Sequence, residues 1–247
     1  MSDEVRVLPL RGIPELEEGD DLGALLVAAA EPSGGFEPRD ILVVAQKVVS
    51  KVEGRVVHLS DIEASPRARE LAGGEDARRI ELILRESKEI LRTRAPLVIA
   101  ETKHGFVCAS AGVDASNAKG PDTLVLLPLD PDASARRLRD RIRQLAGIDI
   151  GVIVSDSFGR AWRRGTTDVA LGVAGIAPLL DLRGRVDTVG YELHASEIAI
   201  ADEIAGAAEL VMGKTEGIPA AIVRGVDAMG EGSGQDLLMP RERDLFR

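Results

Sequence analysis

The sequence predicts a mixed α/β chain, because short β-branched runs alternate with segments of helical periodicity and no linker rich in Pro, Gly or Ser divides the 247 residues. Apolar residues make up 45% of the chain, which is enough to build a substantial core. We therefore expect one globular unit, or two intimately joined ones. In chain order, the runs with the composition of strands are 41–45, 97–102, 106–110, 123–129, 150–157 and 220–225.

Helices are predicted at 22–30, 76–94, 133–145 and 195–212. Within the second of these, Ile80, Ile83 and Leu84, then Ile90 and Leu91, recur at helical spacing with Arg and Glu between them. The segment 225–236 contains four glycines and no apolar run, so it predicts a mobile loop. Both a disordered connector and a ligand-closing lid remain open for it.

Composition excludes several classes of protein. The formal net charge of −10 argues against a general nucleic-acid surface, and 2% aromatic residues leave few platforms for stacking bases. Cys108 is the single cysteine, so no intrachain disulfide can form, and its apolar surroundings predict a buried residue rather than a nucleophile. Because there is no signal-peptide pattern and no apolar run of about 18 residues, we expect a cytoplasmic protein without membrane partners.

The segment HGFVCASAGVDASNA, residues 104–118, places Asp114 and Asn117 just beyond a predicted strand. A carboxylate and an amide beside a turn of small residues suit a metal-phosphate site. The alternative is an Asx-turn in which both side chains cap local backbone, and on this segment alone that alternative is favoured.

The segment SDSFGRAWRRGTTD, residues 155–168, follows the apolar run IDIGVIV. Asp156 and Ser157 are predicted at the carboxyl end of a strand that is covered on both faces, where ligands bind in open α/β sheets. Carboxylate and hydroxyl oxygens suit magnesium or manganese, and Arg160, Arg163 and Arg164 can hold phosphate or carboxylate oxygens. An ordinary polar turn is the weaker interpretation, because such a turn has no use for three arginines in an acidic protein.

Two further segments carry lysines. Gln46, Lys47, Ser50 and Lys51 lie within about one helical turn after a strand, so they could converge on phosphates, although such lysines are more often solvated. Gly-Lys-Thr in MGKTEGIP, residues 212–219, fails as a P-loop because position 208, where the motif needs its first glycine, is an alanine. The histidines show no metal-binding spacing, and only His104 is close to a candidate site.

Five separated segments together resemble the coenzyme F-420-0:L-glutamate ligase family, the γ-glutamyl ligases of deazaflavin biosynthesis. They are VLPLRG near the start, LVVAQKVVSKVEGR, ETKHGFVCASAGVDASN, VIVSDSFGRAWRRGTTDVALGVAG and ADEIAGAAELVMGKTEGIPAAIVRG. The resemblance spans nearly the whole chain in the expected order. It implies an α+β fold with two structural subdomains of unknown boundaries within one unit, residues 1–247, and an intertwined homodimer. The nitroreductase-like second half of some relatives is not expected here.

The resemblance also implies a reaction and its site. The family joins L-glutamate to the lactyl carboxylate of F-420-0 with GTP, and further γ-linked glutamates can follow. Asp114 and Asp156 would hold a divalent metal, Mg²⁺ or Mn²⁺, while Ser157 would help to hold a second, and K⁺ is a further candidate ion. The residues that would surround the nucleotide are Leu8, Pro9, Leu10, Arg11, Gln46, Lys47, Lys51, Asn117, Gly213, Lys214, Thr215, Glu216, Gly217, Ile218 and Pro219.

This sequence departs from its relatives at two positions near the second metal. Ser157 stands where relatives commonly carry Thr, which keeps the oxygen ligand. Lys214 stands where some relatives carry Gln, and a protonated lysine cannot coordinate a metal, so Glu216 becomes a candidate substitute.

The chemistry implied by the family fits these residues. The γ-phosphate of GTP must first convert the carboxylate into an acyl phosphate, and phosphoryl transfer asks mainly for positioning and charge neutralisation. Arg160 and Arg164 are hypothesised to bind the anionic substrates, and His104 and Glu216 are candidate bases. Two alternatives stay open: a metal-dependent nucleotide or phosphate-ester hydrolase that uses Asp114 and Asp156, and a nucleotide-binding subunit without catalysis.

Overall fold

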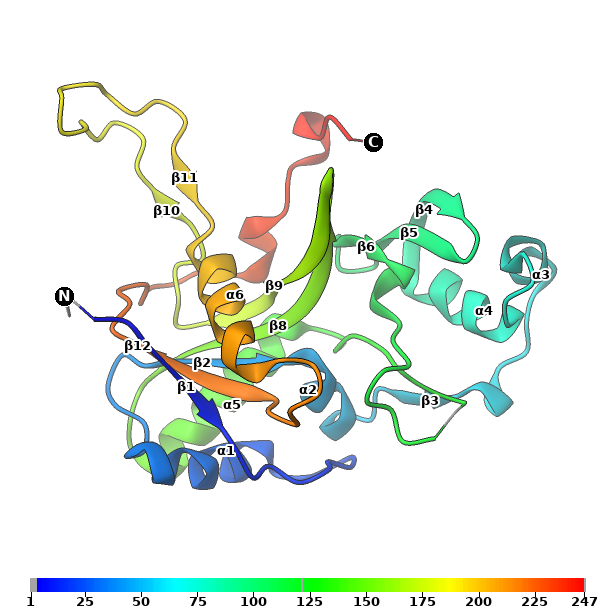
Figure 1. The fold of residues 1–247 in the computed structure, drawn as a ribbon, viewed down its shortest axis with the longest axis horizontal. Coiled ribbons are helices and arrows are strands. Elements are labelled where there is room, and N and C mark those ends of the chain that lie inside the picture. Colours follow the sequence, from blue (N-terminus) through cyan, green and yellow to red (C-terminus); the bar gives the residue numbers. More distant parts are fainter. Residues whose placement is uncertain (1–3, 121, 247) are drawn as a thin grey trace.

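A five-stranded sheet forms the centre of the fold in the computed structural model, which describes residues 4–120 and 122–246 (Figure 1). Its strands lie in the order β1-β12-β2-β8-β9, and only β2 and β8 are parallel neighbours. The α+β class is confirmed. The strands are β1 (Arg6–Leu10), β2 (Ile41–Ala45), β8 (Gly151–Arg160), β9 (Arg163–Ala174) and β12 (Ala220–Arg224).

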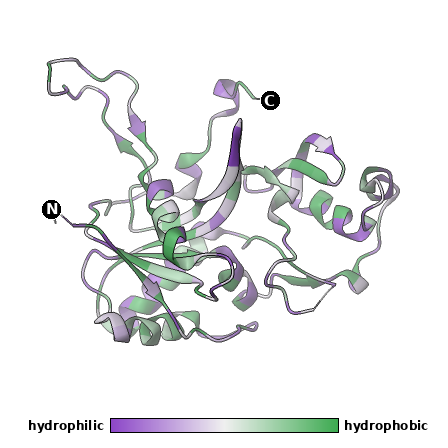
Figure 2. Cartoon of the chain, in the orientation of Figure 1, coloured by the Kyte–Doolittle hydropathy of each residue, from purple (hydrophilic) through white to green (hydrophobic). Residues whose placement is uncertain are grey.

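Helices cover both faces of this sheet. α1 (Leu22–Ala30) and α5 (Pro131–Ala146) pack on one face, and α6 (Ile200–Met212) packs on the other. Alternate residues of β2 serve the two cores, because successive side chains of a strand point to opposite faces: Leu42 and Val44 face α1 and α5, whereas Ile41 and Val43 face α6. Apolar residues accordingly concentrate in the central strands and in the helices on them, whereas the far end of the β8–β9 hairpin is hydrophilic (Figure 2).

A further apolar core is built from residues between 57 and 126. Here α3 (Pro66–Ala72) and α4 (Ala77–Glu86) pack beside an antiparallel sheet of β4 (Ser87–Arg94), β5 (Leu97–Thr102) and β6 (Val107–Ala109). A second antiparallel pair, β3 (Val56–His58) and β7 (Thr123–Val125), contributes Val57 and Leu124 to this core, and α2 (Gln46–Val52) directly precedes β3 in the chain. The expected subdomain boundaries stay a prediction.

A long hairpin arm, which lies between β9 and α6 in the chain, projects from the body near one end of α6 (Figure 1). It is held together by the short strands β10 (Leu180–Asp181) and β11 (Glu197–Ile198). Its apolar side chains Val186, Val189 and Tyr191 are exposed. None of the helices in the described part of the chain is long and apolar enough to cross a membrane.

Several expected boundaries differ from the observed ones. The helix predicted over 76–94 was wrong beyond Glu86, because 87–94 pairs with β5 as strand β4 and tertiary pairing overrides helix propensity. The strand predicted over 123–129 ends at Val125, and the helix predicted over 195–212 begins at Ile200, after β11. Of the other predicted elements, α1 has the expected bounds, and α5 begins two residues early, at Pro131.

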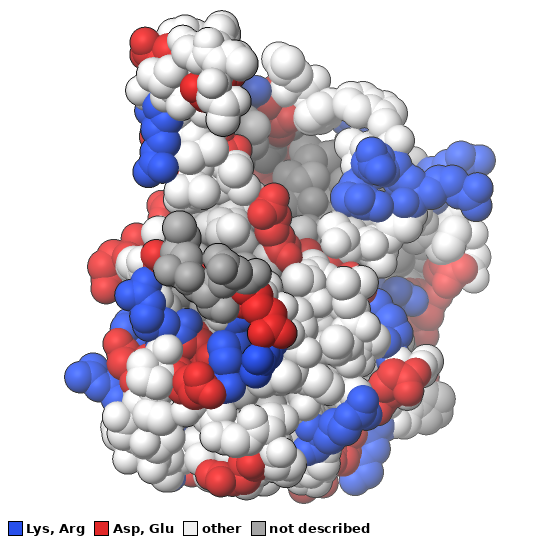
Figure 3. Space-filling view, turned by 60° about the vertical axis from the view of Figure 1, so that its left-hand side comes forward, with Lys and Arg blue, Asp and Glu red and all other residues white. Residues whose placement is uncertain are grey.

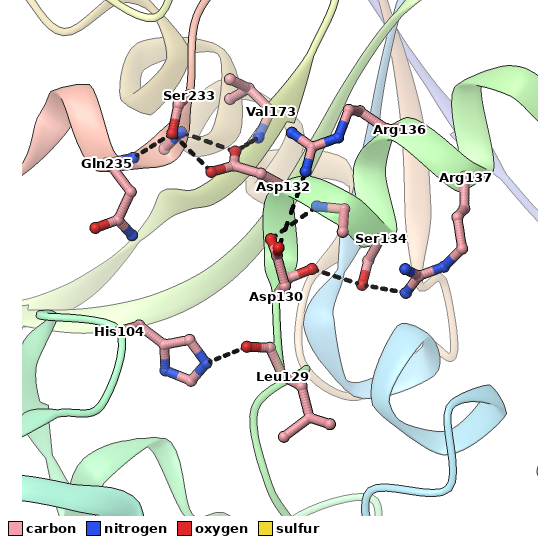
Figure 4. Close-up of polar contacts among 12 residues, drawn as sticks. His104, Leu129, Asp130, Asp132, Ser134, Arg136, Arg137, Val173, Ser233 and Gln235 are labelled. Atoms are coloured by element: carbon pink, nitrogen blue, oxygen red, sulfur yellow. Dashed lines mark hydrogen bonds and ion pairs between the residues drawn. The ribbon is translucent and has the colours of Figure 1, made fainter.

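The glycine-rich segment 225–236 is irregular, as predicted, but it is anchored. The Ser233 hydroxyl and the Gly234 amide donate hydrogen bonds of 2.7 and 2.8 Å to the buried carboxylate of Asp132 (Figure 4). The same carboxylate accepts the backbone N–H of Val173 in β9 at 2.7 Å. The side chain therefore fastens the segment to the central sheet, which favours a fixed connector over a free lid.

Candidate active site

A cleft of about 280 Å³ opens where the parallel strands β2 and β8 stop pairing. β2 runs directly into α2 at Gln46, and the last parallel pair is Ala45 with Ser155. The segment 13–15, the start of α2, the middle of the β8–β9 hairpin and the loop after α6 form the walls. The cleft thus lies at the carboxyl ends of parallel strands, the usual ligand-binding edge of such sheets.

Asp156 lies in the wall of this cleft, although not at a strand end as the sequence suggested. β8 continues to Arg160 as an antiparallel partner of β9, so Asp156 projects from within a strand. Burial, with further contributions from the Asp114 and Asp168 carboxylates, raises the pKa of Asp156 to about 6 against the opposing effects of the Ser157 backbone amide and of Lys47. Burial disfavours the isolated negative charge of this carboxylate, and a bound cation would stabilise the charge.

Asp114 comes from the other core and lies just outside the cleft wall, against Lys47, which is part of the wall. An isolated bridge to Val125 fixes its backbone, and its Oδ2 lies 2.7 Å from the Nζ of Lys47. Its other oxygen accepts the Ser116 amide at 2.7 Å, which is the expected Asx-turn. Burial opposes ionisation, but the hydrogen bonds from Lys47 and Ser116 outweigh it and lower the pKa of Asp114. The Asx-turn and the charged site therefore coexist.

Most of the residues expected around the nucleotide line the cleft. Gln46 is buried, its Oε1 accepts the Ser50 hydroxyl at 2.9 Å, and its Nε2 has no hydrogen-bond partner among the described residues. A buried unpaired donor in a cleft wall is a feature that a ligand acceptor would satisfy. The expected residues in the wall are Gln46, Lys47, Lys51, Asn117, Gly213, Lys214, Thr215, Gly217, Ile218 and Pro219.

Other expected residues lie outside the cleft wall. Leu8 to Leu10 belong to edge strand β1, and Leu10 is buried in the core. Arg11, which follows the strand, is exposed. The nearby residues Ile13 to Glu15 line the cleft instead. Glu216 is exposed and accepts a hydrogen bond from the Thr215 hydroxyl. The loop 213–219 follows α6 and precedes β12, so its Gly-Lys-Thr does not open a helix, which confirms that it is not a P-loop.

The arginines lie at the exposed far end of the β8–β9 hairpin, outside the cleft wall. Arg160 donates to the carbonyl of Arg164 at 3.1 Å, and the chain turns at Trp162, which has a positive φ of 55°. Trp162 is 86% exposed, and its ring contacts the Phe246 ring, with centroids 4.6 Å apart. The arginines could reach only a substrate that extends out of the cleft.

His104 is also outside the cleft wall. Its Nε2 lies 2.9 Å from the carbonyl oxygen of Pro128 and 3.1 Å from that of Leu129, which fixes the ring beside the chain that leads into α5 (Figure 4). Cys108 is buried as predicted, and burial raises the pKa of its thiol to about 12. Neither residue is placed for chemistry in the cleft.

Sequence reasoning missed a second set of polar side chains in the cleft. Asp168 accepts hydrogen bonds from the hydroxyls of Ser155 at 3.0 Å and Ser157 at 2.5 Å, and its amide donates to Glu209 of α6 at 3.0 Å. The sequence held part of the signal for Asp168, because a hairpin that turns at Trp162 places Ser157 opposite Asp168. Glu209 has no comparable sequence signal.

The donor set fits an oxygen-loving divalent cation at Asp114 and Asp156. Asp156 lines the cleft, Asp114 lies beside the wall against Lys47, and hard cations such as Mg²⁺ take carboxylate and phosphate oxygens. Among the described residues, no group of three or more His, Cys, Asp or Glu side chains is arranged to hold a metal without other ligands. Such a cation would therefore need substrate or water oxygens to complete its coordination.

Comparison with known proteins decides the family. The model of the family described as F420-0:Gamma-glutamyl ligase matches residues 12–225. The chain belongs to this family. It is 42% identical over 246 residues to the coenzyme F420:L-glutamate ligase of Archaeoglobus fulgidus, covering 98% of this chain and 96% of the relative.

Further relatives with the same name agree. The one from Methanocaldococcus jannaschii is 43% identical, covering 99% of this chain and 97% of its own length. The one from Methanopyrus kandleri is also 43% identical, with 98% of each chain covered. These matches confirm the family that the five sequence segments resembled.

Proposed function

We propose that this γ-glutamyl ligase family member joins L-glutamate to the lactyl carboxylate of coenzyme F-420-0 and consumes GTP. The γ-phosphate of GTP converts the carboxylate into an acyl phosphate, the glutamate amine displaces phosphate, and GDP is released. Further γ-linked glutamates can be added by the same steps. The names of relatives that align over nearly their whole length support the ligation of glutamate to F-420.

The observation that carries the proposal is that Asp156 and Lys47 line one cleft and that Lys47 is paired with Asp114, which comes from the other core. Lys47 Nζ lies 2.7 Å from Asp114, and its positive charge also acts on Asp156. A bound divalent cation, Mg²⁺ or Mn²⁺, would neutralise phosphate charge here. Asp114 and Asp156 would hold that cation, while Lys47 holds phosphate oxygens and keeps Asp114 oriented.

The charge around the cleft also supports a cationic cofactor. Without a nucleotide, carboxylates in and beside the cleft wall outnumber ammonium groups by two. The carboxylates are those of Glu15, Asp114, Asp156, Asp168 and Glu209, and the ammonium groups are those of Lys47, Lys51 and Lys214. Lys51 is paired with Glu15, and the unpaired Nε2 of Gln46 remains free to donate to a phosphate or base oxygen. These features favour a nucleotide that arrives with a divalent cation.

The assembly and surroundings of the enzyme complete the proposal. A homodimer is supported by the arm 180–198, whose exposed Val186, Val189 and Tyr191 have no apolar core of their own. The substrates are small molecules. In Figure 3 acidic and basic side chains lie together in the lower part of the face, whereas basic side chains alone gather at its upper right. We place the enzyme in the cytoplasm, with K⁺ as a further candidate ion.

The test is to incubate the purified protein with F-420-0, glutamate, GTP and Mn²⁺ and to follow the product by mass spectrometry. We expect glutamate-sized increments with the wild-type protein and none with Asp156→Asn. GTP turnover that does not require glutamate and acceptor would instead indicate the hydrolase alternative. Absence of any increment with authentic F-420-0 would refute the ligase proposal.

A further inference from the structure

A corner of the cleft is lined by oxygen atoms on the face of β8 opposite to Asp156. Ser155 and Ser157 alternate with Asp156 along the strand, so their hydroxyls point away from it. Both hydroxyls donate to the buried carboxylate of Asp168, and Glu209 closes the corner from α6. Two carboxylates and two hydroxyls form a set of ligands suited to a cation.

The corner already contains a cation. The ammonium group of Lys214 donates a hydrogen bond to Ser157 Oγ and lies 3.9 Å from Oε1 of Glu209. Lys214 comes from the loop that follows α6, and the positive φ of Gly213, 60°, turns the chain at the start of this loop. The lysine therefore reaches Ser157 from an element 57 residues away in the sequence.

A protonated lysine cannot coordinate a metal, since all its nitrogen valences are used. The Ser157 hydroxyl donates its hydrogen to Asp168 and accepts one from Lys214. A divalent cation on the same oxygen would lie against the ammonium group, and two cations that close repel each other strongly in a partly buried site. The second metal expected at Ser157 does not fit this arrangement.

The Asp114 side of the cleft differs in its capacity. Each side holds two carboxylates and one lysine, but both oxygens of Asp168 already accept serine hydroxyls and Glu209 accepts the Asp168 amide. On the other side Lys47 takes one position on Asp114, and Asp156 has no ion pair among the described residues. An ionised carboxylate offers about four lone-pair positions, so it can accept a hydrogen bond from an ammonium group and bind a metal at the same time. A single neutral hydroxyl does both less readily. Glu216 cannot replace the missing ligand from its exposed position outside the wall.

We propose that the Lys214 ammonium group takes the place of a second divalent cation, so that each chain binds a single divalent cation with the nucleotide, on the Asp114 and Asp156 side. This inference rests on the proposed function. The fixed positive charge stands beside Ser157 and Glu209, where it can neutralise a phosphate oxygen without leaving with the product. Lys214 is then a positioning and charge-neutralising residue.

The test measures Mn²⁺ bound per chain by equilibrium dialysis in the presence of a non-hydrolysable GTP analogue. We expect one Mn²⁺ per chain for the wild-type protein and for Lys214→Arg, which keeps the charge. Lys214→Gln supplies an amide oxygen in place of the ammonium, so we expect two. Lys103→Gln, the same change at an exposed lysine outside the cleft wall, serves as the control and should bind one.

The outcomes separate clearly. Two Mn²⁺ per wild-type chain would show that the lysine moves aside and would overturn the proposal, as would a Lys214→Gln variant that still binds one. No Mn²⁺ on the wild-type chain would overturn it as well. Since Lys214 is more than half exposed, its replacement should leave folding intact, which the melting temperature checks. Glutamate addition is assayed separately, so failure of the ligase proposal is distinguishable from failure of the single-cation proposal.

Discussion

Replacing Asp156 with asparagine should stabilise the metal-free protein while abolishing its turnover. Burial raises the pKa of Asp156 from 3.8 to about 6, so the folded protein holds this carboxyl proton more tightly than the unfolded chain does. About 1.4 kcal/mol per pKa unit gives a cost of at most about 3 kcal/mol for keeping Asp156 ionised at neutral pH. Asparagine is nearly isosteric and carries no charge, so it removes that cost.

The sign of the effect fixes its pH dependence. Below about pH 4 Asp156 is protonated in the folded and in the unfolded protein, so it does not lower the free energy of unfolding. Between about pH 4 and 6 the folded protein alone keeps the proton, so the stability of the wild-type protein falls as pH rises. The advantage of Asp156→Asn should therefore grow through this window and level off above it. For a chain of this size each kcal/mol corresponds to roughly 2–4 °C in the melting temperature.

The assay is thermal unfolding in EDTA at a series of pH values from 4 to 8. Asp140→Asn, which removes an exposed carboxylate of α5, is the matched control and should not show the pH-dependent gain. Added Mn²⁺ should stabilise the wild-type protein more than Asp156→Asn, because the variant lacks a proposed ligand. An Asp156→Asn variant that is less stable than wild type at pH 7.5 without metal would refute the reasoning.

Three further changes test other parts of the cleft. Gln46→Met removes the unpaired buried donor, so GDP affinity should fall by about tenfold or more in calorimetry, and an unchanged affinity would argue against contact with the nucleotide. Asp168→Ala takes the acceptor from two serine hydroxyls and should cost about 1–3 kcal/mol in urea unfolding; equal stability would contradict the hydrogen bonds described. Arg160→Ala combined with Arg164→Ala should raise the apparent KM for F-420-0 or glutamate with the melting temperature retained, and unchanged KM values for both would exclude a substrate role.

The parts of the site that follow from local sequence were predictable. The apolar runs of β2 and β8 made both strands recognisable, and the polar residues after them indicated Gln46, Lys47 and Asp156. Asp114 was identified in the same way, although its Asx-turn alone did not distinguish a site from a cap. These residues signal themselves because strand composition and turn chemistry are local properties.

The remaining parts depend on pairing between distant segments. Asp168 became visible only through the register of β9 against β8, and the contact of Lys214 with Ser157 only through the fold. The residues 87–94 were assigned to a helix because their periodicity continued that of α4, whereas pairing with β5 decides their conformation. Local patterns carry no information about such partners, and tertiary contacts overrule weak propensities.

The most direct test of the central claim, that this cleft couples GTP to glutamate ligation, is the ratio of GDP released to glutamate incorporated. Both products are measured in one reaction that contains F-420-0, glutamate, GTP and Mn²⁺. The acyl-phosphate route predicts one GDP for each amide bond formed, with GDP formation abolished by Asp156→Asn. GDP that accumulates without glutamate incorporation, or incorporation that proceeds without GDP, would contradict it.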